Sequence, residues 1–396
     1  MASAFDGLWI VDLSQGIAGP YATMCLGDFG ADVVKVEPPG GDYARPLGPP
    51  FVGEDSALFV ALNRNKRSVV VDYARPAGAA LLRRLIERAD VFVADLTPRR
   101  AARLDLTYDQ LRRSNPRLVH CCLTPLGSAG PWAEKPVTEL EIQALTGQTH
   151  YLGRDGEPPV RIGLDASSMS GGQVAYQAIV AALYYRERTG EGQHIDVSQM
   201  QALLSAAALI LTAFDHPDRW EGFHCLARGE PPDYGYRTAD EPFYFGQSYQ
   251  SEQPWIELCE FLGLSELAQD PRFDTRAKRT PRIGELKPLL EAGFEQFPRS
   301  VLLDRVNALG CIAVPINDHE TLFEHPQVIA NDRKLSMPLR DGSQLDTVGF
   351  PWQSSETPGE LRLPPPRLGE HTAAVLAELG LSAAELADLR LEGVLG

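Results

Sequence analysis

The chain has 396 residues, 44% of them hydrophobic and 23% charged, which is typical of a globular protein large enough for two or more domains. Its 37 Lys and Arg against 53 Asp and Glu give a net charge of −16, which disfavours nucleic-acid binding because that function needs a basic face. No stretch approaches the roughly 18 apolar residues of a membrane span, and the first residues lack the pattern of a signal peptide.

The six cysteines contain no CxxC pair and no zinc-site spacing. Such scattered thiols are typical of buried cysteines in a reducing compartment. We therefore expect a cytoplasmic protein that has no membrane partner.

Strand and helix patterns alternate through the first third of the chain. β-branched residues indicate strands, and residues 76–88 begin with a proline that favours the first turn of a helix. This alternation predicts an α/β fold with a parallel, Rossmann-like sheet. The expected strands cover 7–13, 31–37, 67–73, 89–96 and 118–123, and a further helix covers 21–29.

The loop after the first strand loosely resembles a dinucleotide-binding fingerprint. Gly16 and Gly19 follow the strand, and Glu37 ends the second one. The loop reads G-I-A-G-P, however, and Pro20 stands at the start of the following helix. Because the glycine that lets the backbone approach a pyrophosphate is missing, the pattern argues against NAD or FAD.

The most informative stretch is 163–204. Asp165 lies among small residues and precedes a nearly continuous apolar run, 174–185, that predicts a buried helix ending at Gly190. A short strand is expected over 194–197 and another helix over 199–214. Asp165 is then either a helix cap, the commoner role of such an acid, or a reactive group.

The rest of the chain predicts a second, smaller α/β unit. It contains expected helices at 254–262, 284–297 and 300–309 and a strand-like run at 311–317. A strand pair is expected within 331–352, around Asp341-Gly342. We assign the domains as follows: a large Rossmann-like domain of 1–214 and 331–396, a linker of 215–235, and a small α/β domain of 236–330.

Several kinds of site are disfavoured by their missing motifs. The sequence has no H-E-x-x-H, no acidic calcium loop, no G-x-S-x-G elbow and no Walker loop, so we predict no metal site and no α/β-hydrolase triad. Basic residues do follow the fourth strand, where parallel sheets bind ligands. This cluster is an anion site or a solvated helix face; its members are Arg99, Arg100 and Arg103.

Motifs in a fixed order along almost the whole chain resemble the family III CoA-transferases, which include formyl-CoA and carnitine CoA-transferases and α-methylacyl-CoA racemase. The resemblance implies a Rossmann-like large domain, a smaller domain and an interlocked homodimer. The matching segments are D-L-S-Q-G-I-A-G-P (12–20), G-A-D-V-V-K-V-E (30–37), G-D-Y-A-R (41–45), N-K-R-S (65–68), A-D-V-F-V (89–93), A-A-L-Y-Y-R-E-R-T-G-E-G-Q (181–193) and L-G-E-H-T (368–372).

The resemblance also implies an activity: transfer of CoA between an acyl-CoA and a carboxylic acid, with CoA as a substrate and no tightly bound cofactor. Asp165 takes the place of the family's nucleophile, which forms an acyl-aspartyl anhydride, and backbone amides at the helix start are expected to stabilise the oxyanion. Glu139 matches an acid near the nucleophile. Residues matched to CoA contacts are Ile17, Ala18, Val71, Asp95, Leu96 and Arg103.

Three departures from the family pattern bear on specificity. Thr138 stands where racemase members have a catalytic His, Ile17 replaces a Gln of formyl-CoA transferase, and Asp95 replaces an Asn near the CoA phosphates. Two alternatives stay open beside the transferase. One is an α-methylacyl-CoA racemase or other acyl-CoA isomerase, and the other is a non-catalytic CoA-binding subunit of a heteromeric transferase.

Overall fold

The computed structural model describes residues 3–150, 158–208, 235–246, 251–339 and 342–396. The chain divides into two compact units. The first comprises Met1–His150, Val160–Arg219 and Asp332–Gly396, and the second Tyr151–Pro159 and Trp220–Asn331. The proposed linker, 215–235, lies outside the described residues except for Gly235.

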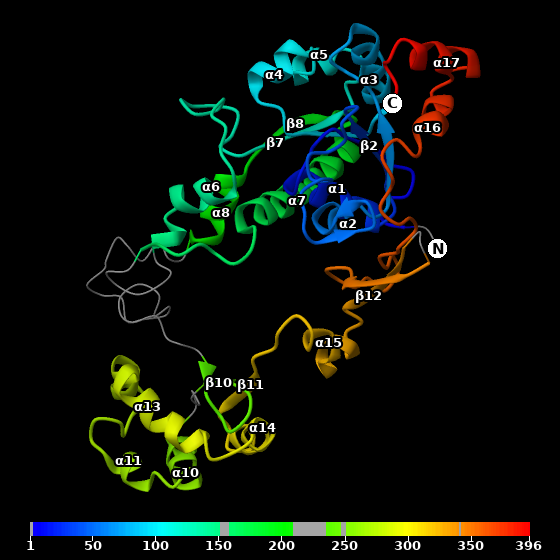
Figure 1. Cartoon of the computed structure of the whole chain (residues 1–396). Coiled ribbons are helices and arrows are strands. Elements are labelled where there is room, and N and C mark those ends of the chain that lie inside the picture. Colours follow the sequence, from blue (N-terminus) through cyan, green and yellow to red (C-terminus); the bar gives the residue numbers. More distant parts are fainter. Residues whose placement is uncertain (1–2, 151–157, 209–234, 247–250, 340–341) are drawn as a thin grey trace. The chain divides into compact units, whose positions relative to one another are not determined.

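A six-stranded parallel sheet organises the first unit, in the order β5-β2-β1-β6-β7-β8. Three of its strands, β2, β7 and β8, are labelled in Figure 1. This is the strand order of a Rossmann sheet, so the predicted α/β class is confirmed. The order reverses between β1 and β6, and ligands of such sheets bind beyond the strand ends at that point. The strands are β1 (Trp9–Asp12), β2 (Asp32–Glu37), β5 (Lys66–Val70), β6 (Val91–Ala94), β7 (Val119–Thr124) and β8 (Gln193–Ser198).

Helices cover both faces of this sheet, because its strands are apolar on both sides. Along β1, Val11 packs into the core under α3 (Pro76–Arg88), α16 (Thr372–Glu378) and α17 (Ala383–Leu391). Ile10 packs into the opposite core, under α1 (Ala18–Asp28) and α7 (Ala166–Thr189). The site described below lies where the N-terminal ends of α1 and α7 meet.

The predicted elements of the first unit are largely confirmed, with shifts of a few residues at their ends. Helix α3 has the predicted bounds. Helix α7 begins eight residues before the apolar run that predicted it, because its first two turns consist mostly of Ser and Gly, and it ends at Gly190 as expected. The remaining elements are β3 (Phe51–Val52), β4 (Asp55–Ser56), α2 (Ala57–Leu62), α4 (Pro98–Arg103), α5 (Tyr108–Leu111), α6 (Glu139–Leu145), η1 (Gln148–His150), α8 (Gln199–Ala206), β12 (Lys334–Pro338) and β13 (Gln344–Val348).

The second unit contains a three-stranded antiparallel sheet of order β11-β10-β9, packed with helices around its own aromatic core. The described part of this unit thus contains both helices and strands. Its elements are β9 (Gly235–Tyr236), β10 (Phe243–Gly246), α10 (Gln253–Phe261), α11 (Ser265–Gln269), α12 (Arg276–Arg279), η3 (Thr280–Arg282), α13 (Ile283–Phe294), α14 (Arg299–Ala308), β11 (Ile312–Pro315), η4 (Leu322–Glu324) and α15 (Pro326–Ala330).

Candidate active site

A pocket of about 390 Å³ opens at the strand-order reversal of the first unit. Its walls come from the loop between β1 and α1, the residue after β6, the segment after β7, and the N-terminal turns of α6, α7 and α8. The volume suits the reactive end of a ligand, since small-molecule sites measure about 300–1,000 Å³. The lining residues are Gln15, Ile17, Ala18, Gly19, Tyr43, Asp95, Leu123, Pro125, Val137, Thr138, Glu139, Ser168 and Gln199.

The loop between β1 and α1 turns sharply to bring Ile17 and Ala18 into the pocket. Gly16 has a φ of +76°, which L side chains rarely adopt, and a Cβ there would lie 1.8 Å from the Tyr43 hydroxyl. Helix α1 then begins with Ala18 and Gly19 in the pocket wall. The first-turn amides of a helix have no acceptor within the helix, so these two amides are available to a ligand.

Glu139, the first residue of α6, caps the N-terminus of the neighbouring helix α7. Its carboxylate accepts hydrogen bonds of 2.7–2.9 Å from the backbone N–H and the hydroxyl of both Ser167 and Ser168, and one of 2.8 Å from Gln143. Burial opposes the charge, but these donors hold the pKa of Glu139 below its ordinary value.

This arrangement corrects one expectation. The backbone amides at the start of α7 do not wait for a substrate oxyanion, because those of Ser167 and Ser168 already donate to Glu139. The amide of Met169 donates to the Asp165 carbonyl. Within the described part of the chain, the first-turn amides of pocket-lining Ala18 and Gly19, in α1, donate to no protein acceptor.

Asp165 occupies the N-cap position of α7, but its side chain makes no capping hydrogen bond. The sequence left open whether Asp165 is a helix cap or a reactive group. Because the side chain of Glu139 caps α7, the Asp165 side chain does not serve as its cap. The Asp165 carboxyl is half-buried, and desolvation followed by the nearby charge of Glu139 raises its pKa, while Arg161 opposes the shift. Asp165 is not among the pocket-lining residues; the pocket-facing residue of this turn is Ser168.

Asp95 follows β6 and faces the pocket. Its carboxylate accepts a 3.1 Å hydrogen bond from the Gln15 backbone N–H. Loss of water around the group raises its pKa to about 6, and neither this hydrogen bond nor the positive charges of Arg100 and Lys35 cancels the effect. Asp95 thus changes charge near neutral pH, in the pocket itself.

The structure brings together four of the residues that the resemblance singled out, and leaves the other four elsewhere. Ile17, Ala18, Asp95 and Glu139 line one pocket. Of the rest, Asp165 lies at the start of α7, Val71 and Leu96 are buried in the core under α3, and Arg103 is exposed at the end of α4.

Other lining residues had escaped the sequence reasoning. Tyr43 is brought over Gly16 by the loop after β2, and its backbone N–H donates to the Gln15 side chain. Ser168 lies three residues after Asp165, a spacing of almost one helical turn. This spacing is the only feature of the sequence that indicates that Ser168 lies near Asp165. Gln199 reaches the pocket from α8 because Gly171 allows the two helices to approach closely.

Among the residues that the structure describes, no group of three or more His, Cys, Asp or Glu is placed to hold a metal ion. In the same residues, no helix is long and apolar enough to cross a membrane.

Comparison with known proteins identifies relatives over nearly the whole chain. Residues 5–372 match the model of CoA-transferase family III. The succinate–glutarate CoA-transferase of Agrobacterium fabrum is 33% identical, over 94% of this chain and 95% of that protein. The β subunit of succinyl-CoA–L-malate CoA-transferase from Chloroflexus aurantiacus is 29% identical, over 98% and 97%.

A solved structure has a similar sequence identity to this chain. A CAIB/BAIF family protein from Brucella suis superposes with a TM-score of 0.85 at 31% identity, covering 96% of this chain and all of that one. The parallel sheet, the pocket at its strand-order reversal and these matches over nearly the full length lead to one conclusion: the chain belongs to CoA-transferase family III.

Proposed function

We propose that this protein transfers CoA between an acyl-CoA and a free carboxylic acid, and that Asp165 is the carboxylate that accepts the acyl group. The supporting observation is that Asp165 accepts no side-chain hydrogen bond among the described residues, while lying close enough to pocket-lining Glu139 to feel its charge. A nucleophile needs a free lone pair, and every oxygen of Glu139 is already engaged.

The transfer proceeds through four nucleophilic attacks. An Asp165 oxygen attacks the thioester carbonyl, the C–S bond breaks, and an acyl-aspartyl anhydride and CoA thiolate result. The thiolate then attacks the aspartyl carbonyl, which releases the donor acid and leaves an aspartyl-CoA thioester. The acceptor carboxylate attacks this thioester to form a new anhydride and free the thiolate. Attack of the thiolate on the acyl carbonyl then yields the new acyl-CoA and restores Asp165.

Each tetrahedral intermediate carries an oxyanion that needs preorganised donors. The unused amides of Ala18 and Gly19 supply them, at the positive end of the α1 dipole. Desolvation assists the nucleophile, since the raised pKa of Asp165 makes its carboxylate more basic.

Trapping of the intermediate tests this proposal. Hydroxylamine added during turnover of succinyl-CoA with glutarate should leave a hydroxamate at Asp165, located by mass spectrometry. Asp165→Ala should abolish exchange and labelling. Asp109→Ala, which removes an acid from the first turn of α5, is the matched control and should keep both. Full exchange by Asp165→Ala, or a label elsewhere, would refute the assignment.

A second candidate function is favoured by a different observation. The residue that α7 contributes to the pocket wall is Ser168, a hydroxyl, and not a carboxylate. A relative of nearly the same length carries the name of a transferase β subunit. On this reading the chain holds acyl-CoA, and a second chain provides the nucleophile.

Exchange assays on the purified chain distinguish the two candidates. A binding subunit should bind acyl-CoA without exchanging it, and Ser168→Asp, which places a carboxylate in the pocket wall, should then give measurable exchange. Exchange by the unaltered chain alone, with the hydroxamate at Asp165, would exclude the subunit role.

A further inference from the structure

The loop Ser14–Gly19, which supplies four lining residues of the pocket, is fixed from below by buried charges. Gln15, Ile17, Ala18 and Gly19 face the pocket. The N–H and carbonyl of Ser14 and the N–H of Gly16 instead contact buried side chains of β1, β2 and the segment after β2. Together with that of the Pro20 carbonyl just after the loop, these contacts involve two lysines and two aspartates, and they do not belong to the proposed transfer chemistry.

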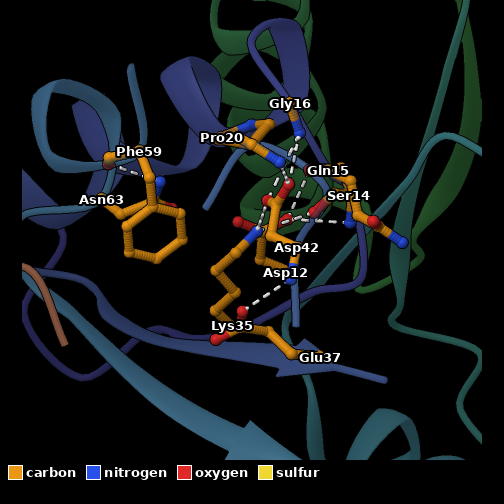
Figure 2. A network of polar contacts seen from close by, with 12 residues as sticks. Asp12, Ser14, Gln15, Gly16, Pro20, Lys35, Glu37, Asp42, Phe59 and Asn63 are labelled. Carbon is orange, nitrogen blue, oxygen red and sulfur yellow. Dashed lines mark hydrogen bonds and ion pairs between the residues drawn. The ribbon is translucent and has the colours of Figure 1, made fainter. Parts of the chain in front are cut away.

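Lys35, on β2, connects the loop to the segment that follows that strand (Figure 2). Its ammonium donates to the Ser14 carbonyl at 2.8 Å and pairs with Asp42 at 2.7 Å. Asp42 in turn accepts the Gly16 N–H at 3.0 Å. One ion pair therefore holds the loop at two points, just before Ile17 and Ala18.

Lys66, on β5, holds Pro20, the residue that directly follows this loop. Its ammonium donates to the Pro20 carbonyl at 2.8 Å and contacts Asp12 at 3.1 Å. Asp12 accepts the Ser14 N–H at 3.0 Å and the Thr23 hydroxyl at 2.7 Å. Buried polar contacts therefore hold the loop at Ser14 and Gly16, and hold the chain at Pro20 directly after it.

These charges are a costly way to stabilise a fold. The side chains of Lys35, Asp42, Lys66 and Asp12 are all completely buried. A buried ion pair is often no more stabilising than apolar residues of the same volume, so its presence alone is weak evidence for a role in stability. Its geometric effect is specific, because it dictates where the N–H and C=O groups of the loop point.

We propose that Lys35 and Asp42 are positioning residues for CoA: together they hold the Ser14–Gly19 loop in the conformation that receives the thioester end of the substrate. This inference depends on the proposed function in one respect, namely that the pocket binds acyl-CoA. It requires neither Asp165 nor Ser168 to be the reacting group.

The chain offers a matched control for the test. Asp28, at the C-terminal end of α1, is as buried as Asp42 and pairs with Arg64 at the same 2.7 Å, but it makes no contact with the loop. Asp42→Asn and Asp28→Asn therefore remove one buried charge each. Only the first disturbs the Ser14–Gly19 loop.

Calorimetric titration with acetyl-CoA, well below the melting temperature of each variant, should separate them. We expect Asp42→Asn to weaken binding by about tenfold or more, because small misplacements of binding groups have large effects, and Asp28→Asn by less than about twofold. Amide hydrogen exchange within 14–19 should accelerate in Asp42→Asn and stay unchanged in Asp28→Asn. That measurement reports loop order without any ligand.

The outcomes are distinguishable. If both variants bind acetyl-CoA as tightly as the unaltered protein, or both lose binding equally, the positioning role is wrong. If loop exchange in Asp42→Asn stays slow, the role is wrong as well. If the unaltered protein itself fails to bind acetyl-CoA, the proposed function fails first, and this inference fails with it.

Discussion

Asp95 shows how one side chain can make substrate binding depend on pH. An ionised acid close to bound CoA phosphates would repel them, and the resemblance places Asp95 near those phosphates. Burial in the pocket weakens this repulsion, because desolvation disfavours the charged carboxylate and raises the pKa of Asp95 to about 6. Because the folded pKa lies above the ordinary value of 3.8, Asp95 favours the folded state at low pH, and this contribution is lost as pH rises from about 4 to 6.

We therefore expect CoA to bind more tightly as pH falls through about 6, since Asp95 becomes neutral there. Asp95→Asn should strengthen binding at pH 7.5 by about five- to tenfold, the effect of a screened repulsion of about 1 kcal/mol. Calorimetric titration of both proteins from pH 5 to 8 measures this effect. The CoA phosphates titrate identically in both series, so parallel profiles would contradict a role for Asp95.

Ser167 and Ser168 allow a comparison between two neighbouring hydroxyls. Each donates to Glu139, but only Ser168 lines the pocket. Ser167→Ala and Ser168→Ala should each lower the free energy of unfolding by about 1 kcal/mol, as expected for one hydrogen bond. Only Ser168→Ala should also raise the KM for acyl-CoA. Equal KM values for the two variants would show that Ser168 does not meet the substrate.

At the scale of elements, the site depends on how closely α1 and α7 approach each other. The close contact is made at Gly172, where a Cβ would lie 2.5 Å from the Ala18 carbonyl oxygen. That oxygen belongs to the backbone of the first turn of α1, so it cannot move without moving the pocket wall. Gly172 is thus required by the close packing of α1 against α7.

Gly172→Ala should force these helices apart, at a cost of about 1–3 kcal/mol in the free energy of unfolding. CoA binding should weaken too, because Ala18 and Gly19 would be displaced. Gly163→Ala is the control, since a Cβ there meets no atom within 4 Å. Urea denaturation and calorimetry measure both effects, and unchanged binding by Gly172→Ala would separate the pocket from this contact.

At the scale of the whole molecule, the chain leaves the first unit and later returns to it. The second unit is built mainly from Trp220–Asn331, and Asp332–Gly396 belongs to the first unit again. The returning segment is fixed by hydrogen bonds such as that from the Asn65 N–H to the Leu363 carbonyl. Large apolar side chains stay exposed on the first unit, among them Leu164 at 58% and Tyr184 at 66%.

We propose that these exposed residues lie in the interface of a homodimer, the assembly expected from the family resemblance. Because the protomer mass is 43.4 kDa, mass photometry should then find a species of twice that mass, about 87 kDa. Tyr184→Glu should shift the protein toward the protomer mass without altering its helical content. A single species at the protomer mass for the unaltered protein would rule out the homodimer.

Local patterns in the sequence determined the elements of this protein. Proline at position 76 marked the start of α3, Gly190 marked the end of α7, and the valines at 33, 34 and 36 marked β2, because turn, cap and strand preferences act between neighbours. The alternation of these elements was enough to predict a parallel α/β sheet. The resemblance of ordered motifs added the family, which the comparisons bear out.

The tertiary structure decided what the site residues do. That Glu139 and not Asp165 caps α7, and that Ser168 faces the pocket, depends on contacts between residues 28 and 29 positions apart. The buried pair of Lys35 and Asp42 likewise joins a strand to a loop through burial that no local pattern records. Hydrogen bonds and desolvation act through space, so the chemistry of a carboxylate depends on neighbours that only the folded chain supplies.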